Sequence, residues 1–370
     1  MNKKLVAAAL GLAFAAPVFA DSSNVTLYGR VHQAIEHNTT DVNGANSSGN
    51  GTNIADYSSR LGVRGVEDLG GGLSAIFAYE FGVDTDAVNT GATNMNTRHA
   101  YLGLKGSYGT FVIGSQDGGN DSQAPLYNQA SAYMFNVNNN AGQLTVVNGN
   151  DAVINRVQRV GNSLGYANTI AGVKVSARHA LGGTDAASGA VPSTENDRRE
   201  SSIAADYTIG ALTFGGGYTR IEGSEAVENT PVTGFNALNS LKSQIQFGAK
   251  YNFGAFQLAG LIGQNKYYGT RNSDNEIAIS GLLPLSANSG VQALYAQAEN
   301  GRATTTAGVQ GGNQETDNTQ AQISYYYDFS KRTRTYVGFN RTNRDAFVAA
   351  TGANIEADDD SFVVGLRHNF

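Results

Sequence analysis

Short segments in which apolar and polar residues alternate recur along the whole chain, and this repeat limits the possible folds more than any other feature. In one of them, Leu73, Phe77 and Tyr79 occupy one side of an extended strand, whereas Ser74 and Glu80 occupy the other. Strict alternation over about ten residues is typical of a membrane-barrel strand with one face toward lipid. The sequence therefore predicts an all-β fold.

The breaks between these segments are of two kinds, which follow each other in turn. Tight turns are predicted at 67–71, 106–109, 208–211, 252–254 and 328–331. Long polar loops are predicted at 38–53, 84–95, 117–154, 182–197, 223–240, 299–318 and 345–357. A transmembrane barrel has short periplasmic turns and extended outer loops, whereas a soluble sandwich has no such strict division. The pattern therefore favours an outer-membrane β-barrel.

Sixteen strands can be counted, at 24–37, 53–66, 71–83, 96–106, 109–116, 155–168, 171–181, 198–209, 211–222, 240–253, 254–266, 272–283, 290–299, 318–329, 332–345 and 358–370. An even number brings both chain ends to the periplasmic side and allows closure, which leaves no unpaired strand edge in lipid. About eight strands fill their interior with side chains, whereas sixteen leave an aqueous lumen. We therefore expect a 16-stranded antiparallel transmembrane β-barrel.

Aromatic residues cluster beside the tight turns, where an amphipathic ring suits the level of the lipid headgroups. The predicted girdle consists of Tyr108, Phe111, Tyr207, Phe214, Tyr251, Phe253, Phe256, Tyr325, Tyr326, Tyr327 and Phe329. The general preference of aromatic residues for strands is the alternative explanation of this clustering.

The N-terminus and the composition indicate export. Residues 1–20 combine Lys3 and Lys4 with a short apolar core and small residues before Asp21, as in a cleaved signal peptide. The barrel is then expected to comprise residues 21–370. Without Lys3 and Lys4, 23 basic residues stand against 31 acidic ones, and this formal charge of −8 argues against a nucleic-acid partner. The chain has no cysteine, so no disulfide is expected.

Five segments, in order along the chain, resemble the general porins of β-proteobacteria, that is, the neisserial and Burkholderia-type trimeric porins. They are VTLYG at 25–29, SRLGVRG at 59–65, EDLGGGL at 67–73, RHAYLGL at 98–104 and VGLRHNF at 364–370. The resemblance implies a homotrimer in contact with outer-membrane lipid and lipopolysaccharide, inserted by the barrel-assembly machinery. It also implies a general diffusion channel for small hydrophilic solutes and ions, without a cofactor. Its third outer loop, here 117–154, is expected to fold into the lumen.

The alternation also predicts which charged residues face the lumen, because Arg or Lys on the lipid face costs about 2–4 kcal/mol at the midplane. The predicted lumen charges are Arg30, Arg60, Arg64, Arg98, Arg159 and Glu80, with Arg98 facing away from His99 and Tyr101. Each arginine could instead lie at a rim of the barrel. The resemblance implies a basic ladder opposite the third loop, which Arg60, Arg98 and Arg159 match best.

The third loop is expected to contribute Asp117 and Asp121 to the pore constriction. Related porins often carry more acidic residues in this loop, so its composition puts cation selectivity in doubt. With few acids to balance the arginines, we expect a weak preference for anions.

Two other functions stay open. A substrate-specific channel, for a sugar or an organic anion, would need a file of aromatic residues along the lumen, and most aromatic residues here fall on the apolar face. A structural or adhesive surface barrel with a plugged lumen is the other alternative. We expect no enzyme and no metal site, because none of the five histidines lies in a catalytic or metal-ligand motif. The acidic run 358–360 is more often a solvated loop face than a divalent-cation site.

The C-terminal residue is a candidate assembly signal. Phe370 shares a strand face with Val364 and Leu366. The last strand must pair with the first, because an unclosed barrel exposes unpaired backbone groups to lipid. We therefore expect Phe370 to be the recognised end of the last strand.

Overall fold

The computed structural model describes residues 24–42, 45–46, 50–85, 95–116, 160–181, 199–222, 241–267, 273–299, 318–348 and 353–370. The first nine strands are β1 (Asn24–Val42), β2 (Ala45–Asn46), β3 (Gly51–Asp56), β4 (Arg60–Gly70), β5 (Leu73–Val83), β6 (Met95–Gly106), β7 (Gly109–Gln116), β8 (Val160–Ile170) and β9 (Val173–Ala180). The others are β10 (Arg199–Ile209), β11 (Leu212–Glu222), β12 (Leu241–Asn252), β13 (Gln257–Tyr267), β14 (Asp274–Ser286), β15 (Ser289–Glu299), β16 (Asn318–Asp328), β17 (Thr333–Val348) and β18 (Ala353–Asn369). Over these ranges, no helix is long and apolar enough to cross a membrane.

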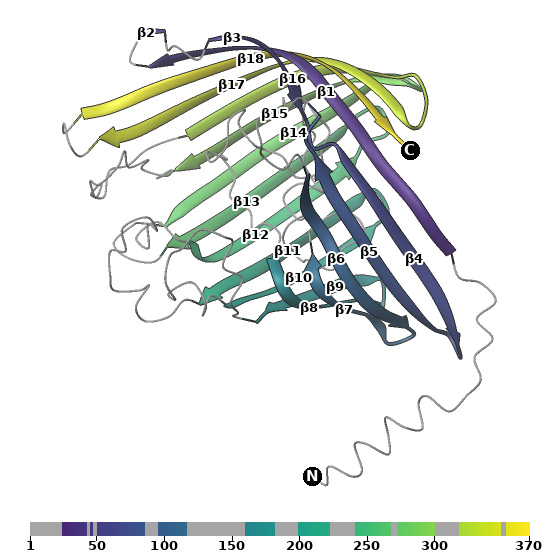
Figure 1. Cartoon of the computed structure of the whole chain (residues 1–370). Coiled ribbons are helices and arrows are strands. Elements are labelled where there is room, and N and C mark those ends of the chain that lie inside the picture. The colour runs from purple at the N-terminus through teal and green to yellow at the C-terminus, as the bar shows by residue number, and fades with distance from the viewer. Residues whose placement is uncertain are drawn as a thin grey trace.

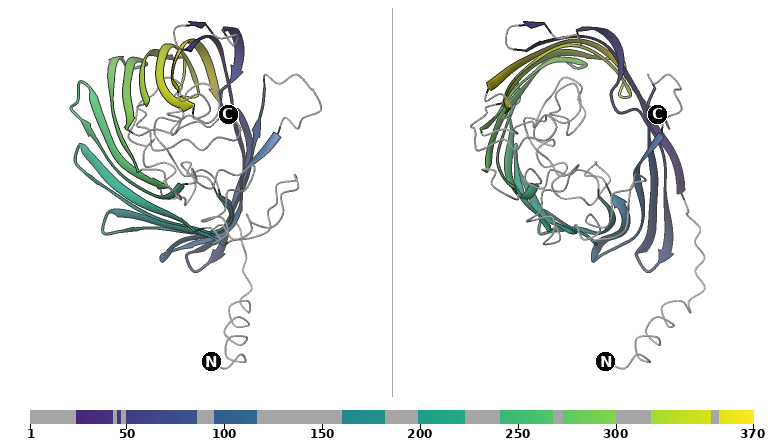
Figure 2. Two further views of the ribbon diagram at one scale, coloured as in Figure 1. Left: turned by 90° about the vertical axis from the view of Figure 1, so that its left-hand side faces the viewer. Right: turned by 60° about the vertical axis from the view of Figure 1, so that its left-hand side comes forward.

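The strands form one closed antiparallel sheet, which Figures 1 and 2 show as the wall of a barrel. Starting from β1, neighbours pair in the order β1, then β4 through β18, and β18 pairs with β1 again. The short β2 and β3 pair with the second half of β1 and add no strand to the ring. The ring therefore has sixteen strands, which confirms the fold predicted from the sequence.

One predicted strand is interrupted. The segment 53–66 is divided into β3 and β4 at residues 57–59. Ser58 has a positive φ of 63°, and the hydroxyl of Ser59 accepts the backbone N–H of His32 at 2.9 Å. The break is therefore held by local hydrogen bonding, which an alternating pattern of apolar and polar residues does not reveal.

Tight turns and longer connections alternate around the ring. Two residues join β4 to β5, β6 to β7, β8 to β9, β10 to β11 and β14 to β15. Gly71 and Gly210 in these turns have φ values of 62° and 55°, which L side chains rarely adopt, so glycine suits them. The third outer loop and its predicted inward fold lie outside the described residues, since β7 ends at Gln116 and β8 begins at Val160.

The two faces of the sheet differ in chemistry. Leu27, Tyr79 and Leu102 point outward and are 62%, 55% and 57% exposed on the isolated chain. Polar residues such as Gln244 and Gln320 are buried on the inner face. Because successive side chains of a strand point to opposite faces, this division follows directly from the alternation in the sequence. An apolar outer face and a polar inner face are those of a transmembrane barrel.

The predicted girdle residues lie beside the tight turns, with one error in their direction. Tyr251 and Phe253, for example, pack with ring centroids 4.5 Å apart. Tyr326 is not part of an outer girdle, because it lies between two outward tyrosines on the same strand and points inward. Its ring lies 3.9 Å from the guanidinium carbon of Arg334.

Several aromatic rings lie over a glycine of the neighbouring strand. The pairs are Tyr28 with Gly62, Phe77 with Gly65, Phe247 with Gly216, Tyr336 with Gly365 and Phe370 with Gly29. A Cβ added at Gly65 or at Gly365 would lie 2.2 Å from the covering ring. Pairs of this kind fix the register of a twisted sheet, because only glycine leaves room for the ring.

The seam between the first and last strands ends in such a pair. The N–H of Gly29 donates to the carbonyl oxygen of Phe370, and the N–H of Phe370 donates to that of Gly29, both at 3.1 Å. A Cβ at Gly29 would lie 2.3 Å from Cζ of the Phe370 ring and 2.7 Å from the carbonyl oxygen of Arg60. The last residue of the chain therefore takes part in closing the barrel.

We expect both the deletion of Phe370 and the substitution Gly29→Val to reduce the amount of folded, heat-modifiable barrel much more than they reduce synthesis. Deletion removes two backbone hydrogen bonds at a seam where lipid offers no replacement, and each unsatisfied group costs several kcal/mol. Valine at position 29 would collide with backbone as well as with a ring. Gly51→Val, at an open position on β3, is the matched control and should fold normally. Equal folded fractions in all three variants would refute a role of this pair in closure.

Candidate functional site

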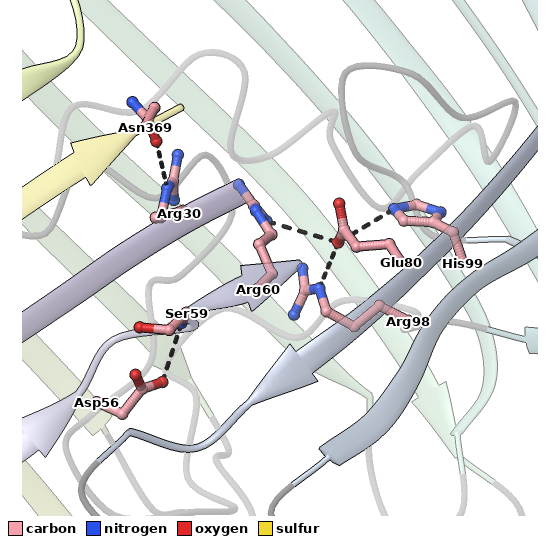
Figure 3. A network of polar contacts seen from close by, with 8 residues as sticks. All are labelled: Arg30, Asp56, Ser59, Arg60, Glu80, Arg98, His99 and Asn369. Atoms are coloured by element: carbon pink, nitrogen blue, oxygen red, sulfur yellow. Dashed lines mark hydrogen bonds and ion pairs between the residues drawn. The ribbon is translucent and has the colours of Figure 1, made fainter. Parts of the chain in front are cut away.

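Arginine side chains from three strands gather at one place on the inner face of the barrel, as Figure 3 shows. Arg30 on β1 lies directly opposite Arg60 on β4 in the antiparallel register. Their chain neighbours Val31 and Leu61 are exposed on the outer face, so both arginines point inward, as the alternation predicted. Arg98 on β6 reaches the same place.

The carboxylate of Glu80 on β5 lies at the centre of this group. Its Oε1 accepts a hydrogen bond from Nε of Arg98 at 2.6 Å and lies 4.0 Å from Nη1 of Arg60. Nε2 of His99 is 3.7 Å from the same oxygen. The Glu80 side chain is only 5% exposed, and a buried carboxylate is stable only where opposite charges or donors compensate its lost hydration. Three side chains thus share one carboxylate oxygen.

Arg98 points inward, but the reason differs from the predicted one. Glu80 pairs with His99, whereas the next residue, Phe81, pairs with Thr97. Arg98 is therefore the extra residue of a β-bulge, a device that turns a side chain away from its regular direction. The bulge brings both Arg98 and His99 to Glu80.

The prediction that Arg98 faces away from His99 and Tyr101 is wrong. Directly paired residues of an antiparallel sheet share a face, and Tyr101 pairs with the buried Ala78. Leu102 is 57% exposed on the opposite face. His99 and Tyr101 therefore point inward, and alternation counted without the bulge assigned this stretch of β6 to the wrong faces.

The basic surface continues across the seam onto β18 and β17. Nε of Arg30 donates to Oδ1 of Asn369 at 2.9 Å. Two residues away on the same face, Arg367 pairs across strands with Arg334. Arg334 in turn donates to both carboxylate oxygens of Asp328, at 2.6 and 2.8 Å. Arg334 and Arg367 were not among the predicted lumen residues, although the alternation that puts Leu366 and Val364 outward also puts Arg367 inward.

The remaining predicted residues fall into two groups. Arg64 shares the inner face of β4 with Arg60, and its guanidinium carbon lies 5.1 Å from the ring centroid of Tyr28. Arg159, Asp117 and Asp121 lie outside the described residues.

A second buried ion pair lies on another part of the wall. Nη2 of Arg178 on β9 donates to Oε1 of Glu200 on β10, and each side chain is 2% exposed. The ring order separates this pair from β1 by several strands. Its charges cancel, so it adds little to the field of the arginines near β1.

We call Arg30, Arg60, Arg98, Arg334 and Arg367 the arginine cluster. Arg30 lies within the field of Arg60, Arg367 and Arg98, with Glu80 as the opposing charge, and Arg367 lies within that of Arg334 and Asp328. Five guanidinium groups and two carboxylates give the group a formal charge of +3. An excess of like charge on one wall attracts small anions and repels cations. In the described part of the chain, no three His, Cys, Asp or Glu residues are grouped so as to hold a metal ion.

The sequence matches known proteins over nearly its full length. A family model described as Gram-negative porin matches residues 6–346. Outer membrane porin protein 32 of Delftia acidovorans is 28% identical over 388 residues, which cover all of both chains. The major outer membrane protein P.IB of Neisseria gonorrhoeae is 36% identical over 121 residues, 31% of this chain and 32% of that one.

Solved structures share the fold. The anion-selective porin from Comamonas acidovorans superposes with a TM-score of 0.64 at 20% identity and covers 94% of this chain and 100% of its own. OmpT of Vibrio cholerae, in-vitro folded and in a trimer form, gives a TM-score of 0.61 at 17% identity, over 95% of this chain and 100% of its own. At these identities the likeness concerns the fold alone.

Glu80→Ala should destabilise the barrel, because it leaves Arg60, Arg98 and His99 close together without their shared carboxylate. Removing one partner of a buried ion pair costs about 3–5 kcal/mol. The measurement is the urea midpoint of the folded barrel in detergent, followed by circular dichroism. Asp358→Ala removes the partner of Arg341 at 2.9 Å, where the side chains are 39% and 47% exposed. Such an exposed pair contributes about 1 kcal/mol at most, so equal midpoints for the two variants would contradict the structural role of Glu80.

Proposed function

Because the chain belongs to the Gram-negative porin family, we propose that its arginine cluster gives the channel a weak preference for anions. The protein is an outer-membrane β-barrel through which small hydrophilic solutes and ions diffuse. Its relative from Delftia acidovorans, matched over the full length, is an outer membrane porin. The observation that carries the selectivity proposal is the sharing of the single Glu80 carboxylate by two arginines and a histidine.

The preference follows from the local charge and not from the total charge of the chain. The sequence carries an excess of acidic residues, but a charge is felt over only about 10 Å at 0.1 M salt. An ion passing the inner wall near β1 therefore responds mainly to the arginine cluster. Many acidic residues belong to predicted outer loops other than the third, for example Asp86, Glu195 and Glu225. In this proposal Arg60 and Arg98 act at the constriction with support from Arg159, and the third loop narrows the lumen beside them.

The porin from Comamonas acidovorans, which has the same fold, is anion-selective, and this agrees with the proposal. The two chains are 20% identical, and the anion preference of this chain is inferred from its own arginines.

A homotrimer is the assembly that the family resemblance favours. The wall of a sixteen-stranded barrel is large enough for one side to pack against neighbouring subunits while the rest contacts lipid. OmpT of Vibrio cholerae, with the same fold, is described in a trimer form. In the same proposal, residues 1–20 are removed on export, Phe370 is the end recognised by the barrel-assembly machinery, and lipopolysaccharide contacts the outer rim.

The substrate-specific channel is the second candidate, and one observation favours it. Among the described residues, five tyrosines lie on the inner face of the strands or beside them: Tyr28, Tyr57, Tyr101, Tyr326 and Tyr336. Two of them stack under arginines, an arrangement that suits an organic anion with an apolar body. Saturable block of the ion current by such a solute would favour this candidate, whereas current proportional to salt alone favours general diffusion.

The double substitution Arg60→Glu and Arg98→Glu should move the zero-current potential in a KCl gradient toward cation preference. The two changes replace two positive charges by two negative ones, and the shift should shrink as salt rises. In molar KCl, where screening reaches about 3 Å, conductance should stay within about twofold of wild type. The measurement is made on purified protein in planar bilayers.

Arg341→Glu is the matched control, because Arg341 lies on β17 opposite Asp360 and is 47% exposed outside the arginine cluster. It should leave the zero-current potential unchanged. An unchanged potential in a correctly folded Arg60→Glu, Arg98→Glu protein would show that selectivity is set elsewhere.

The trimer is tested separately by cross-linking and native mass measurement in mild detergent. We expect the folded protein to run at three times the mass of the mature chain. A monodisperse monomer that still conducts would exclude the trimer.

A further inference from the structure

We propose that His99 makes the ion preference of the channel depend on pH, by adding a proton-controlled positive charge to the arginine cluster. The inference deepens the proposed function and rests on it. The inference begins from the β-bulge of β6. With regular alternation only Arg98 would point inward, whereas the bulge also turns His99 to the inner face.

The position of His99 couples it directly to the charged group. Its Nε2 is 3.7 Å from Oε1 of Glu80, the oxygen that also accepts from Arg98 at 2.6 Å and lies 4.0 Å from Arg60. The His99 side chain is 8% exposed, and its ring meets that of Tyr101 edge-on with centroids 6.3 Å apart. The imidazole is therefore held at a fixed place within the group and not on a mobile surface side chain.

Charged and titratable groups on its own strand and on neighbouring strands surround His99. On β5 it faces the carboxylate of Glu80, and on its own strand Arg98 and Tyr101. Arg60 on β4 acts through Glu80, with Arg30 on β1 next to it. The described strand on its other side, β7, contains no charged residue in its sequence. Of these groups, Glu80 carries the negative charge, and Arg98, Arg60 and Arg30 carry permanent positive charges.

Protonation of His99 changes the balance of this group. With His99 neutral, Arg60, Arg98 and Glu80 together carry +1, and with His99 protonated they carry +2. Histidine is the side chain whose ordinary titration falls between pH 5 and 8. The added charge lies close to the other three and within the screening length of about 10 Å at 0.1 M salt, so a passing ion experiences it. Anion preference should therefore increase as pH falls.

The test compares wild type with His99→Gln in planar bilayers, using the full-length mature protein and a KCl gradient with the dilute side near 0.1 M. For wild type, we expect the anion-to-cation permeability ratio to rise about twofold or more between pH 8 and pH 5, while screening at this salt limits the effect. His99→Gln keeps a polar side chain of similar reach but cannot become charged, so it should lose most of this rise. His99→Lys should give the acid-type preference already at pH 8.

His179→Gln is the matched control. His179 is exposed on β9, with its Nδ1 2.9 Å from the hydroxyl of Ser201, and it pairs with that residue on the outer face. This variant should keep the full pH dependence of wild type.

Two results would overturn the inference: an equal pH dependence in His99→Gln and wild type, or an equal loss in His179→Gln. Failure of the proposed function would give another result: the Arg60→Glu, Arg98→Glu protein would then have the zero-current potential of wild type at every pH. If the double variant shifts the zero-current potential while His99→Gln retains the pH response, the role of the arginine cluster in selectivity is supported and the role of His99 is refuted. The heat-modifiable mobility of each variant establishes that it is folded.

Discussion

The structure depends on one constraint, that every backbone hydrogen-bonding group in the lipid region must find a partner within the protein. A sheet meets this constraint only when its last strand returns to its first. Here β18 pairs with β1 over Arg30 to Val42, and the pairing extends to Phe370, whose backbone exchanges two hydrogen bonds with Gly29. Closure then determines the polarity of the two faces of each strand, because one face contacts lipid and the other lines a lumen that water can fill.

The same closure positions the charges that matter for transport. Along β1 and β18, the pair Gly29–Phe370 lies outward while the next pair, Arg30–Asn369, lies inward, and Asn369 holds Nε of Arg30 at 2.9 Å. Because successive side chains point to opposite faces, one residue of each strand packs at the outer side of the seam and the next points into the lumen. This coupling explains why arginines can gather on strands separated by nearly the whole length of the chain. Strands at the two ends of the sequence are neighbours only in a closed ring.

Much of the fold and part of the candidate site could be predicted from the sequence. Alternation and turn spacing give the sixteen strands, and they place Arg30, Arg60 and Glu80 on the inner face. The wrong predictions come from irregularities of the strands, which interrupt the side-chain period of two but leave no trace in the pattern of apolar and polar residues. The register shift beside Glu80 reverses the assignment of His99 and Tyr101, and the positive φ of Ser58 divides β3 from β4. The same reasoning could have placed Arg334 and Arg367 on the inner face, but the approach of Arg367 to Arg30 depends on the closed ring.

The bulge in β6 then has a physical explanation. In a regular strand, only one of two consecutive residues can reach Glu80. An excess of arginines packed in a wall needs a carboxylate that approaches several of them, since like charges at 4 Å repel by about 1 kcal/mol even in bulk water and by about 4 kcal/mol near a protein surface. By inserting one extra residue, the bulge lets both Arg98 and His99 contact the one buried carboxylate. The carboxylate holds the permanent charges in place but cannot cancel them all, and it holds the titratable group beside them. Local irregularity is therefore what allows a strictly alternating barrel to concentrate charge at one point of its wall.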